Sequence, residues 1–223
     1  MKVALLGKGK TGGHLLNLLQ EKNITHTVFD SNNKPTLDSL KGHDVVISFL
    51  TGEIFKDYIE LLVASKIPVV TGSTGITYDE SLQQKLMEQK TAWIYATNFS
   101  LGMNLIFQMI KVLSRADKIL SEITYSMREV HHTKKLDSPS GTALSWKKWL
   151  GHNLEINSER LGDVIGLHEL KLATKTEEIL ISHNALDRKI FAEGALYAST
   201  LIKTLSPGLY QFQDLVQSEL LKE

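Results

Sequence analysis

The chain has 223 residues, enough for one large domain or two smaller ones with cores of their own. Basic and acidic residues number 25 each, so no overall field attracts nucleic acid or an anionic membrane, and the lack of cysteine excludes disulfides and thiolate chemistry. Residues 1–7 lack the charge-then-core pattern of a signal peptide, and no apolar run approaches the roughly 20 residues of a membrane span. We therefore expect a cytoplasmic protein.

A glycine-rich turn follows the first predicted strand. Residues 3–6 are a continuous apolar run, typical of a strand that is buried on both faces of a parallel sheet. The next six residues read Gly-Lys-Gly-Lys-Thr-Gly, a G-x-G-x-x-G pattern, and a leucine-rich helix follows. A second strand at residues 25–29 ends at Asp30. Glycines in this setting let the backbone approach a pyrophosphate, and the acid can bind ribose hydroxyls. The pattern predicts dinucleotide binding, with a purely structural turn as the alternative.

Strand and helix patterns then alternate as far as residue 96. Further strands are predicted at residues 44–50, 67–70 and 91–96, and further helices at residues 54–62 and 79–89. Such alternation predicts an α/β fold with a parallel, doubly wound sheet. The strand at residues 67–70 leads into Thr-Gly-Ser-Thr-Gly at the edge where open α/β sheets bind ligands. This loop suits a nucleotide contact as well as it suits an ordinary connection.

The pattern changes after residue 99. A helix is predicted at residues 105–113, and residues 122–130 alternate apolar with polar side chains as a half-exposed antiparallel strand does. Two more alternating segments follow at residues 170–175 and 177–183, and an apolar helix spans residues 191–205. These segments predict a second, α+β domain with an antiparallel sheet.

Residues 129–143 gather proton donors beside a predicted helix start. They read Glu-Val-His-His-Thr-Lys-Lys-Leu-Asp-Ser-Pro-Ser-Gly-Thr-Ala. Two adjacent imidazoles, His131 and His132, and a pair of lysines precede a helix start at residues 140–142. The first N–H groups of a helix lack partners within it and attract carboxylates. The combination suits a small acidic substrate that must be protonated.

Two other interpretations of the histidine pair remain open. Pairs of histidines are often ordinary polar residues at a strand end, and pairs of lysines are often a solvated face. A metal site is the other alternative, but neighbouring residues on a strand point to opposite faces, so His131 and His132 would chelate one ion poorly. No H-E-x-x-H pattern occurs either. We therefore expect no metal.

The fixed positions of residues 129–143 resemble a family signature, E-x-H-H-x-x-K-x-D-x-P-S-G-T-A. The family is 4-hydroxy-tetrahydrodipicolinate reductase, also called dihydrodipicolinate reductase, of lysine and diaminopimelate biosynthesis. The resemblance covers nearly the whole chain. It includes residues 6–12, Asp30, residues 72–75, residues 96–100, residues 162–168 and residues 183–192.

The resemblance implies a discontinuous Rossmann-like domain and a homotetramer. Residues 1–99 and 190–223 would form the dinucleotide-binding domain, and residues 100–189 the domain that binds substrate and carries the tetramer contacts. The family reduces a cyclic unsaturated imine dicarboxylate with a hydride from NADH or NADPH, after which the ring must take up a proton. No nucleic acid or membrane partner is implied.

The resemblance also implies roles for single residues. His131 would donate the proton, since the unperturbed pKa of histidine is near neutrality, and Lys135 would be the second donor. The carboxylates would be held by His132, Lys134, Ser140, Gly141 and Thr142. Asp137 is interpreted as a residue that shapes the loop or helix start, and Glu129 either orients an imidazole or is a charge at the strand end.

The cofactor choice is the least determined feature. Lys10-Thr11 stands where the family usually has Arg-Met, and Ser31 stands where many members have an arginine for a 2′-phosphate. We therefore expect a modest preference for NADH, without strong exclusion of NADPH. The residues expected to contact the cofactor are Gly7, Lys8, Gly9, Lys10, Thr11, Gly12, Asp30, Gly72, Ser73, Thr74, Ala96, Thr97, Asn98 and Phe99.

Two rival functions come from other classes. A phosphorylating semialdehyde dehydrogenase would need a nucleophilic cysteine, and the chain has none. A non-catalytic nucleotide sensor would use the same glycine loop but would have no need for the proton donors of residues 129–143.

Overall fold

The computed structural model describes residues 1–222 and separates into two units of tertiary structure. Unit 1 comprises Met1–Leu101 and Lys189–Glu223, and unit 2 comprises Gly102–Arg188. The chain therefore leaves unit 1 once and returns to it, at positions within two residues of the predicted boundaries. Within the described residues no helix combines the length and apolar character that a membrane span needs.

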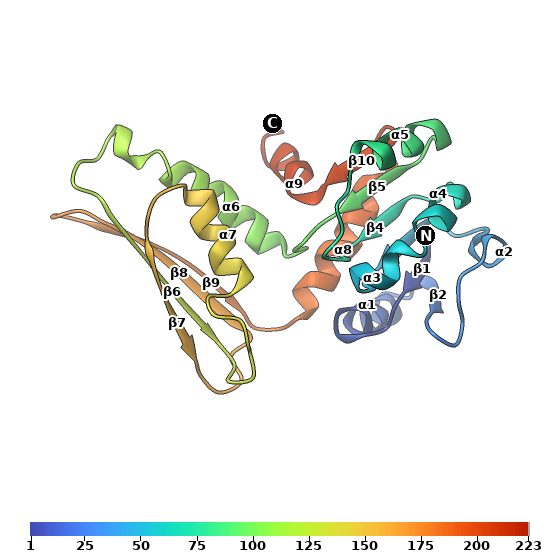
Figure 1. The fold of residues 1–223 in the computed structure, drawn as a ribbon, viewed down its shortest axis with the longest axis horizontal. Coiled ribbons are helices and arrows are strands. Elements are labelled where there is room, and N and C mark those ends of the chain that lie inside the picture. Colours follow the sequence, from blue (N-terminus) through green and yellow to red (C-terminus); the bar gives the residue numbers. More distant parts are fainter. Residues whose placement is uncertain (223) are drawn as a thin grey trace. The chain divides into compact units, whose positions relative to one another are not determined.

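Unit 1 is built on a six-stranded sheet (Figure 1). All of its strand pairs are parallel, and the strand order is β10-β5-β4-β3-β1-β2. The strands are β1 (Lys2–Leu6), β2 (Thr25–Phe29), β3 (Val45–Ser48), β4 (Val69–Thr71), β5 (Ala92–Tyr95) and β10 (Gly208–Gln211). The predicted doubly wound α/β fold is confirmed.

Helices cover both faces of this sheet and form two cores. On one face Val3 and Leu5 of β1 pack with α1 and α8, and on the other Ala4 and Leu6 pack with α2 to α5. Burial on both faces explains why β1 is continuously apolar. The helices are α1 (Lys10–Glu21), α2 (Leu37–Leu40), α3 (Gly52–Lys56), α4 (Ile59–Ser65), α5 (Glu80–Gln89), α8 (Lys189–Leu201), the 3₁₀ helix η2 (Ile202–Thr204) and α9 (Phe212–Leu220).

Two parts of unit 1 differ from the sequence-based expectation. The single helix predicted at residues 54–62 is broken into α3 and α4 around Asp57 and Tyr58. Strand β10 and helix α9 were not predicted, because the Ser-Pro-Gly before them marks only a turn. Long-range pairing creates β10, and the Gly208 N–H donates a hydrogen bond to the Thr91 carbonyl at 3.0 Å. The strand thereby extends the sheet beyond β5.

Unit 2 places two helices on one face of a four-stranded sheet of order β7-β6-β8-β9 (Figure 1). Trp146 and Leu150 of α7 pack with Met103 and Ile110 of α6 against Met127 of β6. The elements are α6 (Leu101–Leu113), the 3₁₀ helix η1 (Ala116–Lys118), β6 (Thr124–His131), α7 (Gly141–Leu150), β7 (Glu155–Arg160), β8 (Gly166–Ala173) and β9 (Glu178–Ala185).

The sheet of unit 2 is mixed, although an antiparallel sheet was predicted. Strand β8 pairs antiparallel with β6 and β9, but β7 pairs parallel with β6. Helix α7 makes the crossover between these parallel strands, so β6, α7 and β7 form a βαβ unit. The His-His segment lies inside this unit, between β6 and α7.

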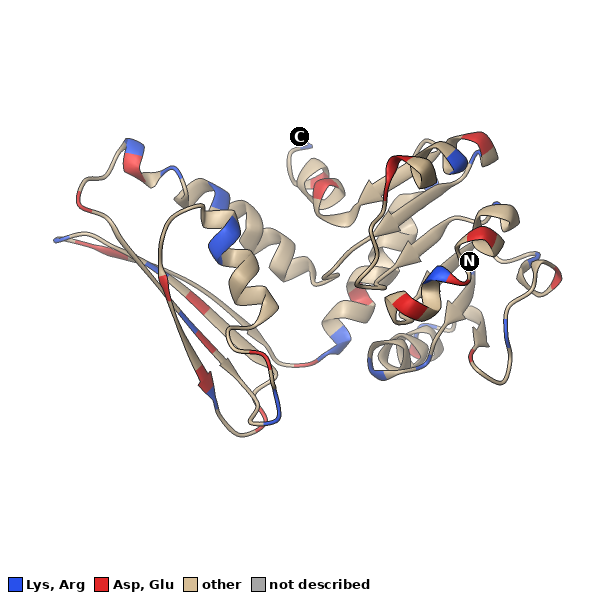
Figure 2. Cartoon of the chain, viewed as in Figure 1, with Lys and Arg blue, Asp and Glu red and all other residues tan. Residues whose placement is uncertain are grey.

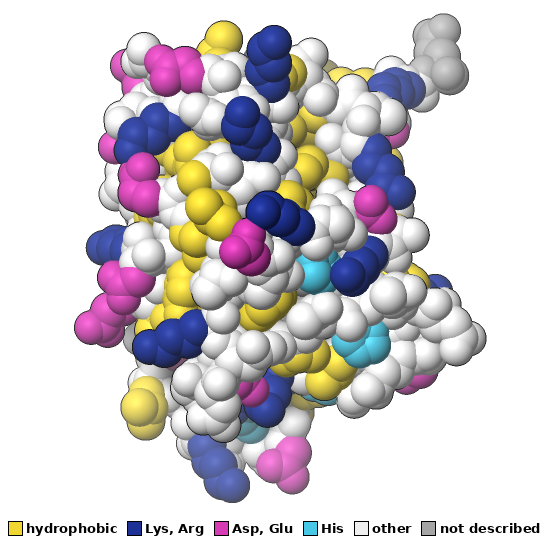
Figure 3. Space-filling view, turned by 90° about the vertical axis from the view of Figure 1, so that its right-hand side faces the viewer, with side chains coloured by type: hydrophobic (Ala, Val, Ile, Leu, Met, Phe, Trp, Pro, Cys, Tyr) yellow, Lys and Arg dark blue, Asp and Glu magenta, His cyan; other side chains and the backbone are white. Residues whose placement is uncertain are grey.

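Charged side chains of both signs are distributed over both units (Figure 2). On the face drawn in Figure 3 they are interspersed with one another and with apolar side chains. In unit 2, Arg128 bridges Glu159 and Glu169 across three adjacent strands, at N–O distances of 2.7 and 3.0 Å. This mixture matches the zero formal net charge.

Candidate active site and cofactor loops

The predicted cofactor segments all begin directly after parallel strands of unit 1. Gly7 follows β1, Asp30 follows β2, Gly72 follows β4 and Ala96 follows β5. The carboxyl ends of parallel strands meet at one edge of a sheet, and the strand order reverses between β1 and β3. This reversal is the position at which open α/β sheets bind ligands. The fold thus brings the predicted cofactor segments to one edge.

The glycine loop is tightly packed on one side and open on the other. Gly7 has a φ of +87°, which favours glycine, and its N–H donates to the Phe29 carbonyl at 2.9 Å. A Cβ on Gly12 would lie 2.0 Å from the Gly7 oxygen, whereas a Cβ on Gly9 would meet nothing within 4 Å. Helix α1 begins at Lys10 with Gly9 as its uncapped N-terminal residue. The open side therefore presents N–H groups that suit a pyrophosphate.

The second and third glycines of this loop, Gly9 and Gly12, allow a matched test. Gly9→Val should weaken cofactor binding by tenfold or more, about 1.4 kcal/mol, because the side chain would fill the space left for the pyrophosphate. Calorimetric titration with NADH measures the affinity. The melting temperature should hardly change, since the space beside Gly9 is open. Gly12→Val, by contrast, should lower the melting temperature. Unchanged NADH affinity in Gly9→Val would contradict the assignment.

Asp30 is already engaged by protein groups. Its Oδ2 pairs with Lys8 Nζ at 2.7 Å, and its Oδ1 accepts hydrogen bonds from the backbone N–H groups of Asn32 and Asn33 at 2.9 and 3.1 Å. The hydrogen bond from Lys8, followed by that of Asn32, holds the pKa of this carboxyl below its usual value. Asp30 is therefore ionised at neutral pH, and Lys8 competes with any ribose hydroxyl for one of its oxygens.

The second loop and the 96–99 segment are held by local packing. A Cβ on Gly72 would lie 2.6 Å from the Phe49 ring, and the buried Ser73 hydroxyl lies 3.5 Å from that of Ser48. Phe99 is buried against Phe49 at a centroid distance of 6.1 Å. These side chains therefore shape the sheet edge, while Thr74 and Thr97 are exposed there. The cofactor contacts expected of these two segments stay predictions.

In unit 2, Glu129 and His131 project from the same face of β6. Residues two apart on a strand share a face, and both side chains are buried: Glu129 is 0% exposed and His131 is 7% exposed. His132 follows the strand and is half-buried. The structure thus separates the two adjacent imidazoles and pairs His131 with a carboxylate.

Glu129 is the hub of a buried polar cluster. Its Oε1 accepts hydrogen bonds from Arg160 Nη1 at 3.0 Å and from the Ser140 N–H at 3.3 Å, and its Oε2 forms an ion-pair contact with His131 Nδ1. His168 lies beside them, with its ring centroid 5.0 Å from that of His131 and its Nε2 3.1 Å from the Ser140 hydroxyl. We refer to these five residues as the Glu129 cluster.

The charge states in the cluster follow from burial and from neighbouring charge. Burial alone would raise the pKa of Glu129, but the hydrogen bonds from Ser158 and Arg160 and the charge on His131 hold that pKa below its usual value. Burial lowers the pKa of His131. Glu129 raises this pKa, whereas the positive charges of Lys135 and Arg160 lower it further. Burial, with the charge of His131, lowers the pKa of His168 to about 3, so this ring is neutral at physiological pH.

Lys135 is held by a neighbouring acid in the loop after β6. Its Nζ lies 2.7 and 2.9 Å from the two carboxylate oxygens of Asp137, and the Asp137 carbonyl accepts a hydrogen bond from Arg160 Nη2 at 2.5 Å. Lys135 is the largest cause that lowers the pKa of Asp137, and the N–H of Gly141 contributes as well. Asp137 thus shapes both the loop and the helix start, and Arg160 joins this loop to the Glu129 cluster.

The helix start at Ser140 leaves fewer groups for an anion than the sequence indicated, because both polar groups of Ser140 are already engaged. The Ser140 hydroxyl is buried and caps α7 by accepting a hydrogen bond from the Ala143 N–H at 3.1 Å, and the Ser140 N–H donates to Glu129. Ser140 therefore positions the helix and the cluster. A substrate carboxylate would rely on Gly141, which is exposed, and on Thr142, which is half-buried.

Two residues of the cluster were not singled out by sequence reasoning. Arg160 lies opposite His131 in the β6–β7 register, and His168 lies opposite Glu129 in the β6–β8 register. The signal was weak, because β7 is short and mostly polar. His168 did stand at the end of a stretch that resembled the family, but nothing in the sequence joined it to His131.

Glu129, His131 and His168 also form a group with the composition of a metal site. One ligand-type atom from each lies within 4.8 Å of the others. This group differs from the His131–His132 pair on which the expectation of no metal rested. Arg160 already balances the Glu129 charge. The absence of a functional metal therefore stays a prediction.

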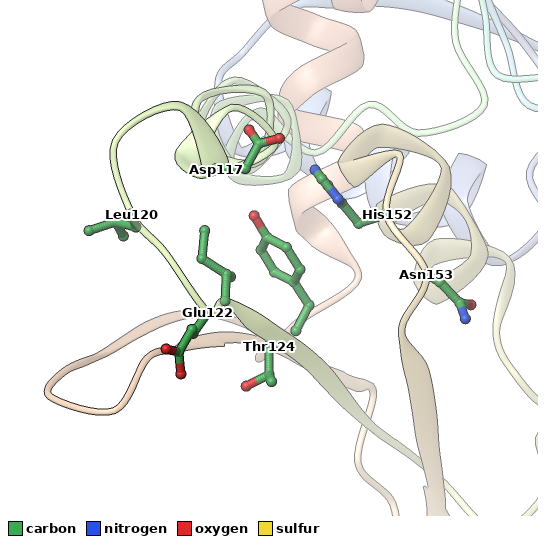
Figure 4. A pocket seen from close by; sticks show the side chains of 8 residues that line it. Asp117, Leu120, Glu122, Thr124, His152 and Asn153 are labelled. Atoms are coloured by element: carbon green, nitrogen blue, oxygen red, sulfur yellow. The ribbon is translucent and has the colours of Figure 1, made fainter.

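A pocket of about 520 Å³ lies at the opposite end of β6 (Figure 4). Tyr125 at the start of the strand stacks on His152 at a centroid distance of 4.9 Å, and the His152 ring is held by the Ser114 carbonyl. The strand spans roughly 20 Å between Tyr125 and His131 at about 3.3 Å per residue. The pocket is therefore separate from the Glu129 cluster.

Comparison with known proteins identifies the family. Residues 1–99 match the N-terminal domain of dihydrodipicolinate reductase, and residues 102–216 match its C-terminal domain. The chain belongs to the dihydrodipicolinate reductase family. Its relatives include a 4-hydroxy-tetrahydrodipicolinate reductase from Thermosipho africanus (31% identity, covering 97% of this chain and 98% of the relative) and one from Alkaliphilus oremlandii (30% identity, covering 93% and 95%).

A solved structure supports the same fold. The dipicolinate-bound dihydrodipicolinate reductase from Paenisporosarcina sp. TG-14 has a TM-score of 0.78 at 22% identity, covering 96% of this chain and 99% of that one. As a member of the dihydrodipicolinate reductase family, the chain is an oxidoreductase that uses NADH or NADPH. The open glycine loop of unit 1 fits such a cofactor.

Proposed function

We propose that this dihydrodipicolinate reductase family member reduces 4-hydroxy-tetrahydrodipicolinate to tetrahydrodipicolinate in lysine and diaminopimelate biosynthesis. The observation that carries the proposal is the Glu129 cluster, which joins an imidazole to the start of α7. Glu129 contacts His131 through one oxygen and accepts the Ser140 N–H through the other. A proton donor and an anion-binding helix start are thereby held together.

The relatives support this substrate. Two proteins that share 31% and 30% identity with this chain carry the name of that reductase. The Paenisporosarcina structure holds dipicolinate, a cyclic dicarboxylate. Assembly as a homotetramer and a cytoplasmic location belong to the same proposal, and for them the support is the family resemblance.

The reaction divides its tasks among the residues of unit 2. The 4-hydroxyl of the substrate leaves as water, which gives the cyclic unsaturated imine, and bound NADH or NADPH would supply the hydride that reduces it. His131 donates the proton that the reduced ring takes up, with Lys135 as the second donor. His131 faces Glu129 through Nδ1, so Nε2 is the nitrogen left for the substrate. Gly141 and Thr142 hold one carboxylate, and His132 holds the other.

Cofactor choice should follow from the Lys8–Asp30 pair. Asp30 disfavours a 2′-phosphate, but Lys8 offsets its charge at 2.7 Å. The wild type should therefore prefer NADH only modestly. Lys8→Ala should widen the NADH/NADPH ratio of kcat/KM by up to about tenfold, 1.4 kcal/mol, while the control Lys22→Ala should leave the ratio unchanged. Steady-state kinetics with both cofactors measure the ratio. A wild-type enzyme that strongly prefers NADPH would show that the loop lysines Lys8 and Lys10 outweigh the effect of Asp30 on a 2′-phosphate.

The substrate proposal is tested by coupling the chain to the synthase that generates 4-hydroxy-tetrahydrodipicolinate. We expect NADH to be oxidised only when both the synthase and its substrates are present, and the decrease in NADH absorbance measures this oxidation. An assay with NAD⁺, phosphate and a semialdehyde, in which the formation of NADH is followed, tests the rival dehydrogenase class. NADH binding without turnover in either assay would favour a nucleotide sensor instead.

A further inference from the structure

The fully buried Glu129 needs a functional explanation. A carboxylate loses its hydration when it is buried, and a buried ion pair seldom repays that cost in stability. Hydrophobic residues would fill the same position on β6 at lower cost. Arg160 partly compensates the charge at 3.0 Å, but the second oxygen of Glu129 is directed at His131.

We infer that Glu129 is a positioning residue that fixes the tautomer and the ring orientation of His131. This inference rests on the proposed role of His131 as proton donor. The contact with Oε2 places the Nδ1 proton toward the carboxylate, so that Nε2 is the atom that gives its proton to the substrate. After that transfer the neutral ring keeps its Nδ1 proton toward Glu129, as in other carboxylate–imidazole pairs.

The other side of the imidazole is bounded by β8. Gly166 lies so close that a Cβ there would be 3.1 Å from His131 Nε2 and 3.6 Å from His168 Cε1. The lack of a side chain at Gly166 therefore leaves room beside Nε2. The His168 ring meets that of His131 edge to face at 75°. Glu129 on one side and β8 on the other therefore fix the orientation of the His131 ring.

The charges that face His131 come from every surrounding element. Glu129 on the same strand is negative, Lys135 in the loop after β6 and Arg160 at the end of β7 are positive, and His168 on β8 is neutral. Glu129 is the only anion in this set, so it opposes the two cations that disfavour a protonated His131. Removal of the Glu129 charge should therefore lower the pH above which His131 loses its proton.

Glu129→Gln tests the inference, because it keeps the shape of the side chain and removes its charge. We expect kcat to fall about 10–100-fold, as when the partner of an oriented histidine is lost, while the affinity for NADH stays constant. The alkaline limb of the kcat–pH profile should move to lower pH. Glu129→Asp restores the charge and should leave that limb near its wild-type position. Glu169→Gln, a matched change on β8 whose carboxylate pairs with Arg128, is the control.

A purely structural role would produce a different result. Loss of folded protein would lower the measured kcat without shifting the pH profile, and that outcome in Glu129→Gln would overturn the inference. ¹⁵N NMR of the wild-type imidazoles gives a second test that needs neither Glu129→Gln nor turnover. The His131 signals are assigned by their loss in His131→Gln. We expect the Nδ1–H tautomer. An Nε2–H tautomer would refute the role of Glu129 even if the reductase activity is established, and an Nδ1–H tautomer would support it even if the substrate proposal fails.

Discussion

Replacement of His131 by glutamine is expected to lower kcat by about 10²–10⁴-fold, the usual contribution of a general acid. Glutamine keeps a polar side chain of similar length but cannot donate a proton of suitable acidity. The affinity for NADH, measured by calorimetric titration, should not change, because the glycine loop lies in the separate unit 1. Circular dichroism should show the same folded state.

A matched control for His131→Gln is available in the same unit. His152 lies at the far end of β6, where it stacks on Tyr125, so His152→Gln should leave kcat within about twofold of the wild type, in line with surface changes of about 0.5 kcal/mol or less. Near-normal turnover in His131→Gln would mean that the proton comes from Lys135 or from water.

Lys135→Ala should produce the second large loss of turnover, also about 10²–10⁴-fold in kcat if the ammonium group takes part in the proton transfer. The variant also leaves Asp137 without the partner that lies 2.7 Å away. Asp137→Asn separates these two effects, since it removes the ion pair and keeps the lysine. Steady-state kinetics at saturating NADH provide the comparison.

The loss in Lys135→Ala should therefore exceed the loss in Asp137→Asn by at least tenfold, about 1.4 kcal/mol. The exposed Lys148 on α7 provides a control for the removal of positive charge from this unit. Equal losses in Lys135→Ala and Asp137→Asn would assign the effect to loop structure and would remove Lys135 from the proton transfer.

Local patterns predicted much of unit 1, because its main features depend on neighbouring residues. The apolar run of β1, the glycines and Asp30 stand in an order that has one common structural interpretation, and the sheet follows it. By contrast, β10 depends on pairing with β5, more than 100 residues earlier in the chain. A four-residue strand after a Pro-Gly turn carries no periodic signal of its own.

The candidate site in unit 2 was predictable only in part, for the same physical reason. His131, Lys135 and the start of α7 are close in sequence, so one motif contains them. Arg160 and His168 reach Glu129 through strand register, which depends on pairing between strands. Glu129, which the sequence also allowed as a charge at the strand end, is a buried partner of His131 in the structure. The sequence did not predict a parallel β7, so it did not predict that Arg160 at the end of β7 contacts Glu129.

The transfer of deuterium from NADH to product tests the central claim most directly. The enzyme is incubated with the synthase, its substrates and NADH that carries deuterium on the reactive face of the nicotinamide, and the product is analysed by mass spectrometry. The proposed function predicts tetrahydrodipicolinate that contains one deuterium from the cofactor. Consumption of the labelled NADH without deuterium in tetrahydrodipicolinate would contradict the proposed hydride transfer.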